Sequence, residues 1–239
     1  MKKYIIAMKK YIPVALVVIP IIVFVSSWFG YKMMFSKETE IHIALVGPIT
    51  SQEEDQKAKP AGISFLQGVE LYIDEINRKG GINGKNIVLD IYDDQNDPEK
   101  ARQKAVEIKN KNRAVAVIGH HYSSCSIAAG EIYKNYGIPA ITPASTNVNV
   151  TMVNEWYFRS SFNDNLQGRF LATYAKEVLK YNTASLIHDN DPYGSYLADV
   201  FEKTSGLLGV RVKYKWDFET SDELLEQNLE QIVNELQYK

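Results

Sequence analysis

The sequence is poor in several features that mark common protein classes. Cys125 is its only cysteine, which excludes an intrachain disulfide and any four-thiolate zinc or iron–sulfur site. It also lacks a basic stripe. Six of its 27 basic and one of its 29 acidic residues lie in 1–38, so the rest of the chain carries a net charge of −7, which argues against nucleic acid. The Gly-x-Ser-x-Gly elbow of α/β-hydrolases is absent. A serine nucleophile, Ser123 or Ser124 with His188 and Asp189, is a minor alternative.

The N-terminal segment is the longest uncharged run in the chain. Residues 11–31 contain no charged side chain, and at 1.5 Å per residue a helix of that length spans the roughly 30 Å hydrocarbon core of a bilayer. Four lysines precede it, which by the positive-inside tendency keeps the N-terminus cytoplasmic and exports the acidic part. The segment is predicted to be an uncleaved signal anchor. A cleaved signal peptide is the alternative, because Val25 and Ser27 are small enough for its cleavage site.

Beyond residue 40, short apolar runs alternate with amphipathic stretches. Strands are expected at 41–46, 86–92, 114–119, 138–142, 184–188 and 210–216, and helices at 63–79, 98–110, 124–136, 166–181, 193–208 and 221–236. This alternation predicts an α/β fold of doubly wound parallel sheets that are covered on both faces. Residues 147–165 show no clear period and are expected to cross between two lobes.

Three local patterns resemble chemical sites but have simpler explanations. The glycine-rich residues 80–85 follow a helix and precede a strand, the reverse of a phosphate cradle, so a helix end and turn are expected. In the acidic run 93–99, Asp97 is expected to cap a helix that starts at Pro98. His120, His121 and His188 lack the spacing of a helical metal site and are expected to be polar strand-end residues. No metal and no cofactor is predicted.

Four loops at one sheet edge are small or rich in hydroxyls. In open α/β folds ligands bind beyond the carboxyl ends of the strands. Ser123 and Ser124 open a helix there, so hydroxyls and free N–H groups converge on one point, which favours a small carboxylate. Helix capping by these serines is the alternative. The loops are 47–62, 120–124, 143–146 and 190–193.

At these residues the chain resembles the type I periplasmic binding proteins, and among them the branched-chain amino-acid (leucine/isoleucine/valine) binding proteins of ABC transport systems. The resemblance runs from about Ile41 to the C-terminus. The blocks that carry it are 68–85, 92–94, 97–98, 117–120, 123–124, 137–139, 142–146, 158–159, 164, 167–168 and 193–194.

The resemblance implies two α/β lobes that close on a ligand. Ser123 would bind the carboxylate of an amino acid, with Ser124 and Ser145 beside it. Ala144 would offer its carbonyl to the ammonium, Thr146 would bind both groups, and Tyr193 would close from the second lobe.

The chain departs from the family in three places. Ala61 stands where relatives often carry an aromatic residue, so the side-chain pocket is expected to differ. Gln95 and Tyr122 occupy the places of a cysteine pair that some relatives have. The chain also ends within the helix expected at 221–236, before the acid that typically pairs with the ligand ammonium, so the second lobe is expected to be truncated.

We therefore expect an extracytoplasmic solute-binding domain, not an enzyme, held in the bacterial inner membrane by one transmembrane helix. Residues 1–38 would form the cytoplasmic N-terminus and anchor, 39–158 the first lobe and 159–239 the truncated second lobe. The ligand would be a small amino-acid-like or carboxylate molecule, and the partner an ABC permease. The alternative is the ligand-sensing domain of a membrane-anchored signalling receptor.

Overall fold

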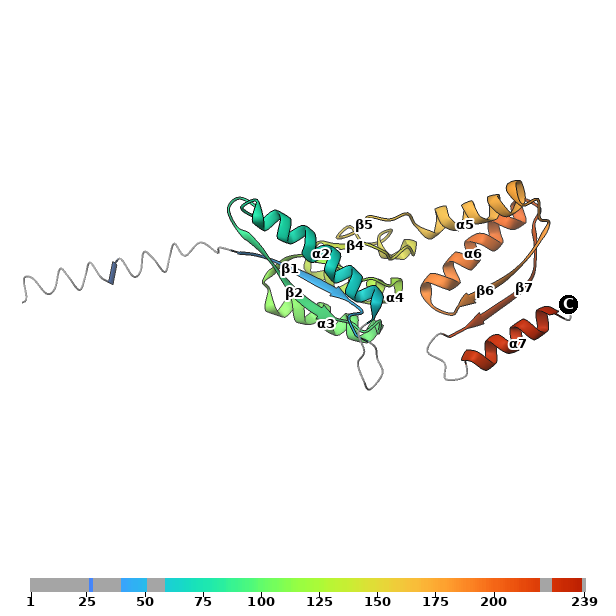
Figure 1. Cartoon of the computed structure of the whole chain (residues 1–239), viewed down its shortest axis with the longest axis horizontal. Coiled ribbons are helices and arrows are strands. Elements are labelled where there is room, and N and C mark those ends of the chain that lie inside the picture. Colours follow the sequence, from blue (N-terminus) through green and yellow to red (C-terminus); the bar gives the residue numbers. More distant parts are fainter. Residues whose placement is uncertain (1–25, 28–39, 51–58, 220–224, 238–239) are drawn as a thin grey trace, which may run out of the picture.

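The structure is a computed structural model that describes residues 26–27, 40–50, 59–219 and 225–237. Its elements form two α/β units in succession (Figure 1). In chain order they are β1 (Glu40–Gly47), α2 (Pro60–Arg78), β2 (Asn86–Asp93), α3 (Pro98–Lys111), β3 (Ala114–Ile118), α4 (Ser123–Tyr136), β4 (Ala140–Thr142), the 3₁₀ helix η1 (Val148–Val150), β5 (Tyr157–Arg159), α5 (Asp164–Thr173), the π-helical turn η2 (Tyr174–Val178), β6 (Thr183–Asp189), α6 (Pro192–Leu207), β7 (Arg211–Phe218) and α7 (Leu225–Gln237).

The first unit is a five-stranded parallel sheet with strand order β2-β1-β3-β4-β5. The order reverses between β1 and β3, and such a switch point leaves a crevice at the carboxyl ends of the strands. Helix α2 packs on β1 and β2, while α3 and α4 pack together on the other side (Figure 1). The doubly wound architecture expected from the sequence is confirmed for this unit.

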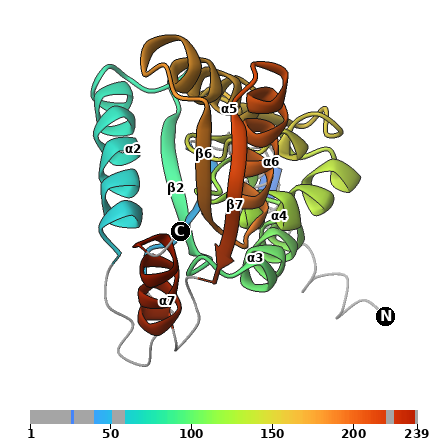
Figure 2. The same ribbon diagram turned by 90° about the vertical axis from the view of Figure 1, so that its right-hand side faces the viewer.

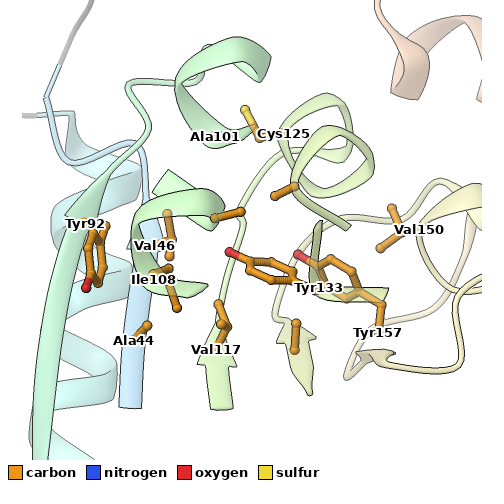
Figure 3. Packing of buried hydrophobic residues seen from close by; sticks show 13 residues of the cluster. Ala44, Val46, Tyr92, Ala101, Ile108, Val117, Cys125, Tyr133, Val150 and Tyr157 are labelled. Atoms are coloured by element: carbon orange, nitrogen blue, oxygen red, sulfur yellow. The ribbon is translucent and has the colours of Figure 1, made fainter. Parts of the chain in front are cut away.

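The core of the first unit lies between its sheet and the pair α3–α4. Two buried tyrosines fill its centre, Tyr133 from α4 and Tyr157 from β5, with ring centroids 6.0 Å apart in an edge-on arrangement (Figure 3). Cys125 is fully buried in the same cluster, and burial raises the pKa of its thiol, so it behaves as a small apolar residue rather than a nucleophile.

The second unit is built on the parallel pair β6–β7. Helices α5 and α6 lie on one side of this pair and α7 on the other (Figures 1 and 2). Residues of both strands alternate between exposed and half-buried, and none is fully buried. This pair therefore has helices on both sides but is less deeply buried than the first sheet.

Most expected elements are confirmed, with ends shifted by a few residues. The strand expected at 138–142 shortens to β4, and the helix expected at 166–181 becomes α5 followed by the π-helical turn η2. Between them η1 and β5 were not expected. Strand β5 is only three residues long, and Phe158 at its centre is 55% exposed, so no apolar period marks it.

Two of the local patterns have the structural role expected of them. Asp97 caps α3, since its carboxylate accepts hydrogen bonds from the backbone N–H groups of Glu99 and Lys100 at 2.8 and 3.1 Å. The glycine-rich residues 80–85 form the end of α2 and a turn, which closes through the Ile82 N–H and the Lys85 carbonyl at 2.9 Å.

The expected transmembrane segment, residues 11–31, falls almost wholly outside the described residues. Across the parts of the chain that the structure describes, no helix combines the length and apolar character needed to cross a membrane. The predicted boundary between lobes at 158/159 falls inside β5.

Candidate ligand-binding site

The candidate site lies at the carboxyl edge of the first sheet, where loops follow β1, β3 and β4. Asp93 at the end of β2 holds the start of the first of these loops, because its carboxylate accepts from the N–H groups of Ile49 (2.8 Å) and Thr50 (3.1 Å). This carboxylate is therefore engaged by backbone N–H groups and by the Thr50 hydroxyl. The side chains singled out from sequence sit on the neighbouring loops.

Ser123 is the first residue of α4 and is 3% exposed. The residue before it, Tyr122, occupies the N-cap position, and no side chain caps the helix. The Ser123 hydroxyl instead accepts a hydrogen bond from the backbone N–H of Asn147, at 3.3 Å. The helix-cap interpretation of Ser123 is therefore wrong: its oxygen joins the loop after β3 to the loop after β4.

The loop after β4 is fixed by a buried hydroxyl network. The Thr142 hydroxyl donates to the carbonyl of His120 at 2.7 Å, and the hydroxyls of Ser126 and Ser145 each lie 3.3 Å from the same oxygen. The Ser126 and Ser145 hydroxyls also contact each other, at 2.7 Å. This network sets the shape of the loop, and in this structure the Ser145 hydroxyl is committed to it.

Asn147 connects the two α/β units. Its amide Nδ2 donates to the carbonyl of Pro192 at 2.5 Å, and Pro192 is the first residue of α6. The next residue, Tyr193, thereby lies at the same junction, where its hydroxyl accepts a 3.5 Å hydrogen bond from Gln167. Asn147 is 2% exposed. Sequence reasoning named it only as the start of the crossover, because a single Asn in a loop carries no signal of such a contact.

Asp164, the first residue of α5, is a fully buried acid. Its backbone N–H donates to the Thr146 carbonyl at 3.0 Å, so its side chain lies beneath the loop after β4. Neither carboxylate oxygen completes a hydrogen bond within the part of the chain that the structure describes. Burial raises the pKa of this carboxyl, although the Thr146 hydroxyl and the charge of Arg159 oppose the shift.

Arg159 braces the same loop from β5. Its guanidinium donates to the carbonyls of Ser145 (3.0 Å) and Asn147 (2.9 Å) and to the hydroxyl of Thr151 (2.7 Å). Burial lowers the pKa of Arg159, and the nearby Asp164 charge opposes that shift. Arg159 and Asp164 were noted in the sequence only as parts of matching blocks, without a role.

Five of the six candidate residues are thus linked through the loop after β4: Ser123 by its hydroxyl, Ala144, Ser145 and Thr146 by membership of the loop, and Tyr193 through Asn147 and Pro192. Thr146 is 8% exposed, and Ala144 is half-buried with its N–H directed to Thr142. Ser124 is half-buried at the start of α4.

His120 and His188 lie in different units and do not come together as a metal site. His120 is fully buried in the first unit, where its ring contacts Asp94 at 2.7 Å and the Tyr133 hydroxyl at 3.0 Å. His188 lies on β6, with its ring against the carbonyl of Asp189. Across the described residues, no group of three or more His, Cys, Asp or Glu side chains could hold a metal.

A parallel sheet with hydroxyl-rich loops at its carboxyl edge, joined through a buried crossover to a second α/β unit, is an architecture in which small ligands commonly bind beyond the strand ends. Residues 40–232 match the family described as periplasmic binding protein, and the chain belongs to that family.

Curated relatives are similar over most of this chain. An amino acid binding protein of Pseudomonas aeruginosa is 36% identical over 173 residues, which are 72% of this chain and 45% of the relative. A leucine-, isoleucine-, valine-, threonine- and alanine-binding protein of the same organism is 33% identical over 184 residues, which are 77% of this chain and 48% of the relative. The chain thus spans about half the length of these relatives, which are binding proteins and not enzymes.

Solved structures share the fold. A leucine binding protein from Thermotoga maritima superposes with a TM-score of 0.70 at 25% identity, covering 81% of this chain and 53% of that one. An ABC transporter substrate-binding protein from Desulfitobacterium hafniense, solved in complex with Leu, superposes with a TM-score of 0.65 at 28% identity, covering 83% and 56%.

Proposed function

We propose that this chain is the solute-binding domain of an ABC-type uptake system and that its ligand is a small amino acid. The single observation that carries the ligand class is Asp164, a fully buried carboxylate whose oxygens complete no well-formed hydrogen bond among the described residues and are approached only by the Thr146 hydroxyl, next to a loop of hydroxyl and backbone groups. A buried acid whose hydrogen bonding is incomplete is costly, and a ligand ammonium would supply further charge and donors.

In this proposal the ligand's two charged groups meet different parts of the site. The Ser123 hydroxyl, whose hydrogen is not used in its bond from Asn147, donates to the ligand carboxylate, with Ser124 and the Ser145 loop backbone beside it. The Ala144 carbonyl and Asp164 receive the ammonium, and Thr146 contacts both groups. Tyr193 approaches from the second unit. The names of the relatives and the Leu complex support an amino-acid ligand for this chain.

The test is calorimetry on the full chain with L-leucine and two analogues, 4-methylpentanoate without the ammonium and isoamylamine without the carboxylate. Only leucine, or another amino acid in the same series, is expected to bind. Asp164→Asn should lower the affinity for the amino acid at least about tenfold, since an ammonium–carboxylate hydrogen bond contributes about 1.5–3 kcal/mol. Asp74→Asn, on the exposed face of α2, is the matched control. Equal binding of the desamino analogue would contradict the proposal.

Membrane anchoring is the second part of the proposal. Residues 11–31 carry no charge and four lysines precede them, so we propose a signal anchor that holds the domain on the extracytoplasmic side of the bacterial inner membrane. The expressed chain should stay in the membrane pellet after alkaline carbonate extraction. A soluble mature form beginning near Trp28 would show a cleaved signal peptide instead.

The same anchor favours a second candidate function, the sensor domain of a membrane-bound signalling receptor. An uptake protein works with a permease, whereas a sensor is joined to an output domain. A permease gene beside the gene for this chain would support transport. A second transmembrane segment followed by a kinase or cyclase domain in a longer transcript would support sensing.

A further inference from the structure

A second concave feature lies between α5 and α6, on the second unit. It has a volume of about 380 Å³. Residues of both helices line it, one turn apart along each: Asn165 and Arg169 from α5, and Tyr196, Asp199, Val200, Lys203, Thr204 and Leu207 from α6. We refer to it as the α5–α6 groove. None of the six candidate site residues lines it.

The groove exists because the two helices cross closely at one point. Gly168 of α5 faces Val200, and a Cβ added to that glycine would lie 2.7 Å from Val200 Cγ1. The groove lies beside this crossing, and Val200 belongs to its lining. A hydrogen bond from the Tyr196 hydroxyl to the Asn165 side chain, at 3.0 Å, joins the helices beside the groove.

The charges that line the groove are unbalanced. Arg169 and Lys203 have no ion-pair or hydrogen-bond partner within the described part of the chain. The one acid in the lining, Asp199, is already paired, because Lys215 of β7 donates to it at 2.6 Å and to Glu202 at 3.2 Å. The groove therefore offers two free cations and a neutralised acid.

We propose that the α5–α6 groove binds a small organic dianion, a dicarboxylate of about the length of glutarate. Arg169 and Lys203 each take one acidic group, as charge-assisted hydrogen bonds favour. Thr204, which also lines the groove, adds a hydroxyl group. Val200 and Leu207, the latter 82% exposed, give the lining an apolar part that suits a short methylene chain and not a fully hydrated inorganic ion.

The test is calorimetry on the full chain with three probes: glutarate, pentanoate with the same carbon count and one carboxylate, and inorganic pyrophosphate. Glutarate is expected to bind, more tightly than either other probe, and less tightly as sodium chloride rises from 50 to 500 mM. Arg169→Gln with Lys203→Gln should weaken glutarate about ten- to thirtyfold, as partly exposed pairs contribute up to about 1 kcal/mol each. Lys213→Gln on β7, outside the groove, is the matched control and should change nothing.

Two further variants separate this groove from the amino-acid site. Asp199→Asn removes the negative charge from the lining and should tighten glutarate binding severalfold. Asp164→Asn should leave glutarate binding unchanged, and the groove variants should leave amino-acid binding unchanged, so either proposal can fail alone. Absence of glutarate binding, equal binding of pyrophosphate, or insensitivity to the Arg169 and Lys203 changes would each overturn the proposal.

Discussion

At the scale of single residues, the two hydroxyls predicted to hold a ligand differ in their surroundings. Ser123 accepts a buried backbone hydrogen bond, so its hydroxyl has a structural role as well as the proposed binding role. Ser123→Ala should therefore lower the affinity for the ligand about ten- to a hundredfold. It should also lower the free energy of unfolding by about 1 kcal/mol. Thr146→Ala should weaken the ligand by a similar factor. Calorimetry and denaturant titration measure the two effects.

The control for these variants must be chosen with the structure in view. Ser126 lies one turn into α4, but its buried hydroxyl contacts Ser145 and the His120 carbonyl, so its loss would disturb the loop after β4. Ser64 on the exposed side of α2 is the better control, and Ser64→Ala should change neither quantity. If Ser123→Ala alters stability but leaves ligand affinity unchanged, Ser123 is purely structural.

Asp164 makes a prediction about pH. Burial raises the pKa of its carboxyl above the ordinary value of 3.8, so the folded state holds this proton more tightly than the unfolded state. The contribution of Asp164 to stability therefore falls as pH rises from that ordinary value through the raised pKa. Asp164→Asn has no such proton, so without ligand it should gain stability relative to the native chain between pH 4 and pH 8.

Thermal or urea unfolding at several pH values measures this difference. For the Asp74→Asn control, the difference in free energy of unfolding from the native chain should not change with pH, because Asp74 is exposed on α2. If the difference in free energy of unfolding between Asp164→Asn and the native chain does not change with pH, the Asp164 carboxyl titrates alike in the folded and unfolded states, which would contradict the prediction.

At the scale of elements, the packing of α5 on α6 depends on one glycine. A methyl group at Gly168 would meet Val200 Cγ1 at 2.7 Å and the backbone N of Phe201 at 3.1 Å, and the backbone cannot give way cheaply. Gly168→Ala should therefore destabilise the second unit by about 1–3 kcal/mol. Gly206→Ala, on the same helix pair but with open space around it, is the control and should be neutral or slightly stabilising. If Gly168→Ala and Gly206→Ala changed the free energy of unfolding equally, the close approach at Gly168 would not determine how α5 packs on α6.

At the scale of the whole molecule, one face of the first sheet is only partly covered. The row Ile91, Leu45, Ile118, Ile141 and Phe158 crosses the sheet on the α2 side. Leu45 in the middle is fully buried, but Ile91, Ile141 and Phe158 are 47%, 40% and 55% exposed. Bare apolar rows on a sheet favour association.

We therefore expect the full chain to self-associate in detergent-free or mild-detergent solution as its concentration rises. Ile141→Ser with Phe158→Ser should reduce this association without loss of the cooperative unfolding transition, as measured by sedimentation velocity. Met152→Ser with Val153→Ser, two other exposed apolar positions outside the sheet, is the control. A native chain that stays monodisperse at high concentration would contradict the prediction.

The sequence by itself determined the alternation of elements and most of their ends. That information is local: apolar spacing marks the strands and helices, and Asp97 followed by Pro98 marks the start of α3 through contacts within a few residues. It also placed the candidate loops at strand ends, since that position follows from the order of elements. Strand β5 was not predicted from the sequence, because three residues with an exposed central side chain show no apolar period.

Tertiary structure alone decided which groups in those loops are already bonded. The Ser123 hydroxyl meets the Asn147 N–H, and the Asn147 side chain meets Pro192, across separations of 24 and 45 residues. The isolation of Asp164 beneath Thr146 likewise depends on the crossover, and the α5–α6 groove on the contact at Gly168. No local pattern encodes such contacts, because they depend on how whole elements pack and on which polar groups that packing removes from water.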